Sequence, residues 1–369
     1  MTRVVHLRSG QGLYGAERSL LSLAGATEQP LRPVVASLVR PGREDSLGDE
    51  ARRMGFEAVR IDAPGRLSWT ALPPLLRLAR GAILHAHDYK SLLLGLTAGA
   101  ATGAPVVATF HGDTGHSRLV RAYEAVARRA ARRATAVAAT SEVLASRIRA
   151  STPGLPVHVI PNGIRLAPLP TPDERRAARQ KLGLRPDSYV VAFVGRLAPE
   201  KGPELLLRAV RANGCVVLLA GDGPLRPALE LERGGADARF LGFIPDVAPV
   251  LAAADVMALP SRTEGLPMAV LEAMAAGLPV IASAVGSLPE VLGQGAGVLI
   301  AAGDVEALRA TLAELRRPEA RAVLARAGRA RVEARYSAQA MARSYRERLY
   351  QPALERAGAG IDSPALHFR

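Results

Sequence analysis

The chain has 369 residues, which is enough for two domains with separate hydrophobic cores. A hydrophobic content of 49% with few aromatic residues is typical of a soluble α/β protein. The single cysteine, Cys215, excludes an internal disulfide framework and fits a reducing compartment. The net charge of +14 comes almost wholly from arginine, but single-strand-binding, zinc-finger and RNA-recognition patterns are absent from the sequence. Nucleic acid is therefore not expected as a partner.

Short apolar runs alternate with helix-length segments over the first 160 residues, which favours a parallel, doubly wound sheet. Residues 91–110 carry no charge over a length that could cross a bilayer. Three glycines and Pro105 divide this segment into a helix and a strand, however, so no transmembrane segment is predicted. The predicted strands are Val4–Leu7, Pro33–Val39, Ala58–Ile61, Ile83–His85, Val106–Thr109, Ala136–Ala139 and Val157–Ile160.

The loop after the first predicted strand is rich in glycine and opens a helix. Gly10, Gly12 and Gly15 satisfy the Gly-x-Gly-x-x-Gly fingerprint of dinucleotide-binding folds. That fingerprint normally has an acidic residue about twenty positions further on, at the end of the second strand. Here the second strand ends at Arg40, which could meet the 2′-phosphate of NADP. An NADP-dependent oxidoreductase is therefore one interpretation of this half of the chain.

Histidines stand at two neighbouring strand ends. His111 follows the strand predicted at Val106–Thr109, at the carboxyl edge of the sheet, where open α/β sheets bind their ligands. We expect it to have a functional role. His85 and His87 flank the preceding strand end, but no Cys or carboxylate cluster accompanies them. We interpret these two as acceptor-side or structural groups rather than metal ligands.

Six arginines then recur at helical spacing, which predicts a basic stripe along one side of a helix. Most such stripes are solvated faces. The alternative hypothesis is that the first domain rests on an anionic membrane surface and takes a lipid-linked acceptor. The residues are Arg118, Arg121, Arg128, Arg129, Arg132 and Arg133.

A linker and a second αβ series follow. Three prolines between Ile164 and Pro172 prevent a helix, and residues beyond about 304 are helical in pattern to Leu354. We predict two Rossmann-like domains, residues 1–165 and 166–337, and a C-terminal segment, residues 338–369. The strands predicted for the second domain are Tyr189–Val194, Val216–Ala220, Arg239–Leu241, Val256–Leu259, Pro279–Ala282 and Gly297–Ile300.

Two cations follow the first strand of the second series. The strand leads to Gly195, and Arg196 and Lys201 come next at a spacing that can point both into one cleft. Arginine offers phosphate a planar fork and lysine a mobile point charge. The pair can therefore neutralise a diphosphate, although a solvated charged loop would show the same residues.

The segment Glu264–Glu272 sets two carboxylates eight positions apart around a Gly-Leu-Pro break. We predict Pro267 as the first helical residue, because its missing N–H would be unpaired there anyway. Glu264 then lies on the loop and Glu272 inside the helix. The unpaired amides of a helix start bind anions, and carboxylates accept hydrogen bonds from hydroxyls. A phosphate flanked by two sets of hydroxyls describes a sugar nucleotide.

These two motifs together resemble the donor-site signature of family-four retaining glycosyltransferases, the "glycosyl transferases group 1" type, which use nucleotide sugars. The resemblance implies the GT-B fold: two Rossmann-like doubly wound domains facing a cleft, with a C-terminal helix crossing back to the first domain. It implies that Arg196 and Lys201 bind the donor diphosphate and that Glu272 binds the ribose. It also implies that Glu264 and the amides after it hold the donor sugar.

The resemblance extends to the first domain, with two departures. Family members have a histidine that contacts the transferred sugar, so His111 and Glu264 are the expected catalytic residues. Tyr14 replaces the first glycine of the family's Gly-Gly pair, and Arg165 stands where the family usually has Asp. Only Gly15 is then expected to approach the donor phosphate. The expected donor-binding set is Gly15, Arg196, Lys201, Ile244, Gly265, Leu266, Pro267, Met268 and Glu272, with Phe243 as the alternative to Ile244 at the nucleobase.

The resemblance implies retaining transfer of a hexosyl group from a UDP- or GDP-type sugar to a hydroxyl acceptor, in cell-envelope glycan, polysaccharide, lipopolysaccharide or glycolipid synthesis. No Asp-x-Asp motif occurs in the sequence, so neither a metal ion nor another cofactor is expected. The expected location is the cytoplasm, with a peripheral position on the inner face of the cell membrane as an option. Two alternatives stay open, an NADP-dependent oxidoreductase and a non-catalytic nucleotide-sugar-binding partner.

Overall fold

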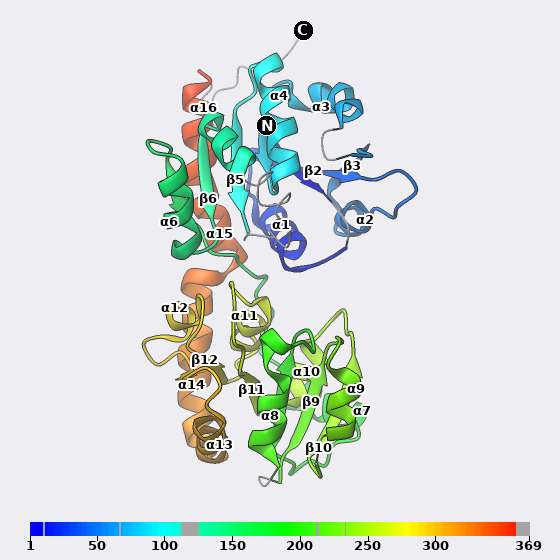
Figure 1. Ribbon diagram of the computed structural model, residues 1–369, viewed down its shortest axis with the longest axis vertical. Helices are drawn as coiled ribbons and strands as arrows, with labels where there is room; N and C mark the ends of the chain where they lie inside the picture. Colours follow the sequence, from blue (N-terminus) through cyan, green and yellow to red (C-terminus); the bar gives the residue numbers. More distant parts are fainter. Residues whose placement is uncertain (10–11, 66–67, 112–124, 212–213, 233, 359–369) are drawn as a thin grey trace. The chain divides into compact units, whose positions relative to one another are not determined.

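The computed structural model describes residues 1–9, 12–65, 68–111, 125–211, 214–232 and 234–358 (Figure 1). The chain forms two compact units. The first comprises Met1–Arg165 and Ala338–Arg369, and the second comprises Leu166–Ser337. Each unit is built on one parallel sheet, with seven strands in the first and six in the second. The α/β fold predicted from the sequence is therefore confirmed.

All thirteen predicted strands are present, with ends shifted by at most two residues. The alternation of apolar runs with helix-length segments is thus enough to locate the strands. In the first unit the strands are β1 (Thr2–Ser9), β2 (Leu31–Val39), β3 (Glu57–Asp62), β4 (Ala82–Ala86), β5 (Val106–Phe110), β6 (Ala136–Ala139) and β7 (Val157–Val159). In the second they are β8 (Val190–Val194), β9 (Val216–Ala220), β10 (Asp237–Gly242), β11 (Val256–Leu259), β12 (Val280–Ser283) and β13 (Val298–Ile300).

The first sheet has the strand order β3-β2-β1-β4-β5-β6-β7 and carries helices on both faces (Figure 1). Side chains alternate between the faces. Val5 and Leu7 belong to the core beneath α3, α4 and α6, whereas Val4 belongs to the core of the opposite face. Among the described residues, no helix is long and apolar enough to span a membrane. The helices of this part are α1 (Gly15–Ala26), α2 (Ser46–Arg53), α3 (Leu72–Ala79), α4 (Tyr89–Thr102) and α6 (Glu142–Ser151).

The end of the chain returns to the first unit, as predicted. It consists of α15 (Ala338–Tyr345), the π-helical segment Arg346–Tyr350 and α16 (Gln351–Arg356). Their apolar side chains complete the core on one face of the first sheet, where Val4 and Ile83 are buried. These C-terminal helices therefore belong to the helical layer that covers one face of the first sheet.

The second sheet has the strand order β10-β9-β8-β11-β12-β13, again all parallel. No regular helix or strand occupies residues 165–170, and Thr171 caps the next helix by accepting a hydrogen bond from the Glu174 amide. The helices are α7 (Pro172–Lys181), α8 (Pro203–Val210), α9 (Arg226–Glu232), α10 (Ala248–Ala253), α11 (Met268–Ala275), α12 (Leu288–Leu292), α13 (Val305–Glu314) and α14 (Pro318–Arg331), followed by the π-helical segment Val332–Tyr336.

Both sheets reverse their strand order once. The reversal lies between β1 and β4 in the first unit and between β8 and β11 in the second. Loops on either side of such a reversal leave the sheet in opposite directions, which opens a crevice at the carboxyl ends of the two strands. The loops after β1, β4, β8 and β11 are therefore the places where each unit can bind a ligand.

Candidate functional site

The loop after β8 is held by backbone hydrogen bonds and by one close contact. The Gly195 amide donates to the Ala220 carbonyl at 3.0 Å, and a 3₁₀ turn then covers Pro199–Lys201. Gly202 has a φ of +63°, and a Cβ there would lie 2.3 Å from the carbonyl oxygen of Pro260, just after β11. Only glycine tolerates both conditions. The fold thus fixes Lys201 against the end of the neighbouring strand.

Lys201 and Glu264, which come from separate sequence motifs, form one ion pair. The Lys201 Nζ atom lies 2.7 Å from each carboxylate oxygen of Glu264, and the Ser261 hydroxyl donates to Oε1 at 2.7 Å. The Glu264 side chain is only 3% exposed and the Lys201 side chain 24%. Glu264 uses two of the three ammonium donors, so among the described residues one N–H of Lys201 remains for a ligand.

Arg196 lies on the same loop but is more exposed. Its guanidinium pairs with Glu200, and 66% of its side chain is accessible to solvent. Any diphosphate contact of Arg196 must therefore compete with this surface pair, which by itself is worth little.

The backbone carbonyls of Glu264 and Gly265 are held by close contacts with Gly286 and Ser287. Gly286 has a φ of +57°, and a Cβ there would lie 2.0 Å from the Glu264 carbonyl oxygen. The Ser287 amide and hydroxyl both donate to the Gly265 carbonyl. Within the described residues, the backbone amides of Gly265, Leu266 and Met268 have no backbone acceptor. These donors, at the start of α11, can serve an anion.

The predicted start of this helix is wrong by one residue. Pro267 is the N-cap, with an extended ψ of 113°, and α11 begins at Met268. The Pro267 carbonyl accepts the first bond, from the Val270 amide at 3.1 Å. The fixed φ of proline fits both positions, so residue type alone could not decide between them.

Two further residues predicted to bind the nucleotide-sugar donor are Glu272, on α11, and Ile244, just beyond the carboxyl end of β10. Glu272 is inside α11, as predicted, and is half-buried. Ile244 follows β10 and is half-buried, whereas Phe243 next to it is 72% exposed. Their contacts with ribose and nucleobase stay predictions.

In the first unit, polar side chains bind the two loops at the strand reversal. The Asp88 carboxylate, after β4, accepts from the Ser9 amide at the end of β1 at 2.6 Å. Glu17 is buried and accepts from the Tyr14 amide at 3.1 Å and from Arg8 at 2.8 Å. Gly15 is the exposed first residue of α1.

The glycine fingerprint is seen only in part, because Gly10 lies outside the described residues. Arg40, on which the NADP alternative depends, is exposed after β2. Neither observation decides between a dinucleotide and a nucleotide sugar.

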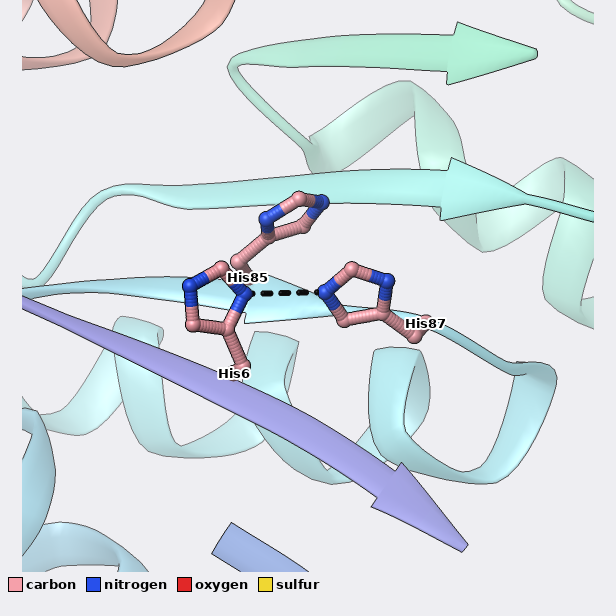
Figure 2. A group of neighbouring side chains, drawn as sticks. All are labelled: His6, His85 and His87. Carbon is pink, nitrogen blue, oxygen red and sulfur yellow. Dashed lines mark hydrogen bonds between the residues drawn. The ribbon is translucent and has the colours of Figure 1, made fainter. Parts of the chain in front are cut away.

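His111 is the end of a chain of three histidines. Its Nε2 atom lies 3.3 Å from Nδ1 of His87, and His87 Nε2 lies 3.0 Å from Nδ1 of His6 (Figure 2 shows the second bond). Sequence reasoning missed His6. The two-residue period of a strand predicts that His85 and His87 share a face, but His6 is placed beside them only by its pairing with His85 in the sheet.

His85 has a structural role in this cluster. Its Nδ1 atom bonds the Tyr350 hydroxyl at 2.8 Å, and its Nε2 atom bonds the Thr109 hydroxyl at 2.7 Å. Thr109 in turn bonds the Tyr345 hydroxyl at 3.0 Å. The C-terminal helices are therefore joined to β4 and β5 by buried hydrogen bonds.

All four histidines are neutral at pH 7. Burial lowers the pKa of His6 to about 3. The pKa of His111 is also lowered to about 3, chiefly by burial and then by the Arg8 charge, against an opposing effect of the Asn162 side chain. Burial also lowers the pKa of His85 and His87 well below the ordinary value. None of these rings can act as a cationic group in the site.

The described residues contain one group with metal-ligand geometry, namely His6, His85 and His87, whose ligand nitrogens lie within 4.8 Å of one another (Figure 2). Three histidines suit zinc by ligand type. However, both ring nitrogens of His85 already have hydroxyl partners, and a metal would have to displace one of them. The trio therefore fits a hydrogen-bonded cluster better than a metal centre.

The arginine stripe is only partly as predicted. Arg118 and Arg121 lie outside the described residues. Arg128 is half-buried and donates to the Tyr89 hydroxyl at 3.5 Å, while Arg129 is exposed. The remaining two arginines are exposed, but they belong to the 3₁₀ turn Ala131–Arg133, closed by a bond from the Ala134 amide to the Ala131 carbonyl. One continuous helical face is therefore not formed by the described arginines.

Two protein-family models match this chain, one in each half. The model described as "Glycosyltransferase Family 4" matches residues 14–167, and the model described as "Glycosyl transferases group 1" matches residues 174–331. A mannosyltransferase of Corynebacterium glutamicum is 33% identical over 269 residues, 66% of this chain and 70% of that protein. The chain belongs to glycosyltransferase family 4.

The C. glutamicum relative of this family-4 chain is a GDP-mannose-dependent monoacylated alpha-(1-6)-phosphatidylinositol monomannoside mannosyltransferase. A D-inositol 3-phosphate glycosyltransferase of Saccharomonospora viridis is 34% identical over 286 residues, 67% of this chain and 65% of that protein. Against the Mycobacterium marinum protein of the same description, the matched segment spans 38% of that protein. The chain thus matches less than two thirds of the length of these inositol phosphate glycosyltransferases.

Solved structures agree with the fold of the family-4 chain. The Anabaena protein HepE, crystallised with UDP, superposes with a TM-score of 0.80 at 22% identity, covering 95% of this chain and all of that one. At this level of identity the likeness shows the fold alone, which is GT-B.

Proposed function

We propose that the protein is a retaining glycosyltransferase that moves a sugar from a nucleoside diphosphate sugar to a hydroxyl acceptor. The observation that carries this proposal is the Lys201–Glu264 ion pair at the strand reversal of the second sheet. It brings together a cation suited to phosphate and a carboxylate suited to sugar hydroxyls, at the edge where such sheets bind ligands.

The donor would extend along the loops at this edge. In the proposal, the third ammonium proton of Lys201, the Arg196 guanidinium and the Met268 amide at the start of α11 hold the diphosphate. Glu272 accepts from the ribose hydroxyls, and Glu264 with the amides of Gly265 and Leu266 holds the sugar. The roles follow from what each group can donate or accept and from the family's motif.

Chemistry in this proposal needs no protein nucleophile. The sugar leaves its phosphate while the acceptor hydroxyl approaches from the same side, and the departing phosphate takes the acceptor's proton. His111 is neutral with a pKa of about 3, which makes it a poor general base near pH 7. Its proposed role is therefore a neutral hydrogen bond to the substrate, with Gly15 allowing close approach of the backbone.

Metal independence is also part of the proposal. In transferases that need a divalent cation, the metal neutralises the leaving diphosphate. Here Lys201, Arg196 and the helix start would supply that positive potential. Transfer that is abolished by a chelator and restored by added metal would contradict this part.

The donor base, the acceptor and the cellular setting are proposed from the relatives. One relative uses GDP-mannose, and the superposed HepE structures contain UDP, in one case with glucose. The relatives' names describe acceptors that contain inositol phosphate or phosphatidylinositol. We propose a UDP- or GDP-sugar donor and a cytoplasmic, envelope-glycolipid pathway with a hydroxyl acceptor.

Peripheral membrane binding is the finer part of this proposal. It rests on the exposed Arg129, Arg132 and Arg133, because an anionic surface attracts clustered basic residues. Sedimentation with anionic and with neutral liposomes tests it: binding only to anionic vesicles supports the proposal, and equal binding to both contradicts it.

The proposed reaction is tested by a thermal-shift screen of UDP- and GDP-sugars with NADPH in the same panel, because a ligand that binds the folded state raises its melting temperature. A shift with one nucleotide sugar is expected. A shift with NADPH alone would instead support the oxidoreductase alternative. With the donor identified, transfer to inositol-containing acceptors separates an enzyme from a non-catalytic binding partner, and Glu264→Ala should reduce that transfer at least about tenfold, since hydrogen bonds to charged groups contribute about 1.5–3 kcal/mol.

A further inference from the structure

Three imidazoles form a continuous chain from the core of the first unit to its predicted catalytic residue. His6 Nδ1 meets His87 Nε2 at 3.0 Å, and His87 Nδ1 meets His111 Nε2 at 3.3 Å. Among the described residues, the two outer nitrogens of this chain, His6 Nε2 and His111 Nδ1, are buried without a partner. The chain therefore has two bonds inside and one open nitrogen at each end.

The protons of this chain are coupled. A neutral imidazole carries one N–H, and each of the two inner bonds needs one donor and one acceptor. If His87 carries its proton on Nδ1, it donates to His111, whose own proton must then be on Nδ1. His87 Nε2 then accepts from His6 Nδ1, and His6 Nε2 keeps a bare lone pair.

The opposite arrangement reverses every proton. His87 would donate from Nε2 to His6, and the His6 proton would lie on Nε2, a completely buried N–H with no acceptor among the described residues. Buried N–H groups without partners are rarer in proteins than under-satisfied acceptors. The first arrangement instead places its open N–H on His111, which directly follows β5 at the ligand-binding edge of the sheet.

The surroundings of His111 agree with the first arrangement. The Asn162 side chain is not a hydrogen-bond partner of His111 Nδ1 in the structure, but it raises the pKa of His111, which is the direction expected when an acceptor oxygen faces the ring. The Ser19 hydroxyl donates to that same Asn162 oxygen at 2.9 Å, so the amide oxygen is turned to act as an acceptor.

We propose that His87, backed by His6, is a positioning residue that holds His111 as its Nδ1–H tautomer, so that His111 offers an N–H donor to a substrate oxygen. The identity of that oxygen, on the donor sugar or its phosphate, rests on the proposed function. Ordering of one imidazole by a second group is a known way to fix a tautomer.

Nitrogen NMR of protein labelled with ¹⁵N-histidine tests the tautomer directly, with the His111 signals assigned by their loss in His111→Asn. The wild type at about pH 7 should show His111 protonated on Nδ1. His87→Leu removes the donor to Nε2 and should give a mixture of tautomers. His87→Asn places an amide donor near the lost Nδ1 position and should restore the Nδ1–H form.

A matched control is His158→Asn, because His158 is a half-buried histidine of β7 outside the chain of three. It should leave the His111 signals and sugar transfer unchanged. His87→Leu should reduce transfer at least about tenfold, with recovery in His87→Asn, as expected when a group that orients a catalytic histidine is removed. A merely structural role of His87 would not predict that the conservative variant restores both the tautomer and the rate.

A His111 ring protonated on Nε2 in the wild type would overturn the proposal, and so would an Nδ1–H tautomer that persists in His87→Leu. If His87→Leu does not fold, His6→Leu serves instead, because it removes the proton that His87 Nε2 accepts. A correct tautomer together with no response to any nucleotide sugar would overturn the proposed function and leave the positioning role of His87 in place.

Discussion

Acidification should destabilise the first unit strongly, because this unit holds four histidines in neutral form, three of them buried and His111 half-buried. His6 and His111 have a pKa of about 3, and burial holds the pKa of His85 and His87 well below the ordinary value. In the unfolded chain each has a pKa of about 6.5. Between these values the unfolded state binds protons that the native state does not bind, so the free energy of unfolding falls as the pH falls.

The size of the effect follows from proton linkage. Lowering the pH from about 7.5 to about 5.5 reduces the free energy of unfolding by about 1.4 kcal/mol for each histidine that stays neutral in the native state and has a pKa of about 6.5 in the unfolded chain. These four histidines together should lower the free energy of unfolding by about 5 kcal/mol. Carboxylates contribute little in this window, because their ordinary pKa values near 4 leave them ionised in both states.

The assay is urea unfolding at the two pH values. Unfolding is monitored by hydrogen exchange in peptides from β1, β4 and β5, because these peptides report on the first unit alone. His6→Asn removes one titrating ring. The decrease in the free energy of unfolding between the two pH values should therefore be about 1.4 kcal/mol smaller in this variant than in the wild type, whatever the stability of the variant at the higher pH. A wild-type loss below about 2 kcal/mol, or a loss unchanged by His6→Asn, would refute the reasoning.

Three further changes give expected outcomes of known sign. Gly286→Ala combines a positive φ with a clash of 2.0 Å and should destabilise the second unit by more than Gly295→Ala, which has a φ of +77° but open space around it; the excess, measured by urea unfolding, should be about 1–3 kcal/mol. Asp255→Asn leaves three arginines, Arg175, Arg179 and Arg321, without their buried carboxylate and should cost about 3–5 kcal/mol, whereas Asp187→Asn, which breaks an exposed pair, should cost less than about 1 kcal/mol in the same assay. Incubation with EDTA should leave the rate of sugar transfer unchanged, because no step of the proposed reaction uses a metal ion, and loss of transfer would show the opposite.

The fold could be predicted largely from the sequence. Most of the parallel strands are buried on both faces and give apolar runs of a few residues, which located them along the chain. Helix boundaries were less certain. Pro267 fits both the N-cap and the first helical turn, and the arginine repeat to Arg133 continues beyond the end of its helix into a 3₁₀ turn.

The site was predicted in pieces. Lys201 and Glu264 were each expected to bind the donor, but their ion pair spans 63 residues of sequence and depends on β8 and β11 being neighbours. His6 was missed for a related reason. A single histidine in an apolar strand gives no signal by itself, and only the pairing of His6 with His85 in the sheet brings it beside the other histidines.

The central claim is that the second unit binds a nucleotide sugar through Lys201, and calorimetric titration tests it most directly. The nucleotide sugar that gives the largest thermal shift should bind the wild type at one site per chain. Lys201→Ala should bind it at least about tenfold more weakly, because a charge-assisted contact to phosphate contributes about 1.5–3 kcal/mol. Lys181→Ala, which removes an exposed lysine of α7 in the same unit, should bind as the wild type does. Equal affinity of Lys201→Ala and the wild type would contradict the account.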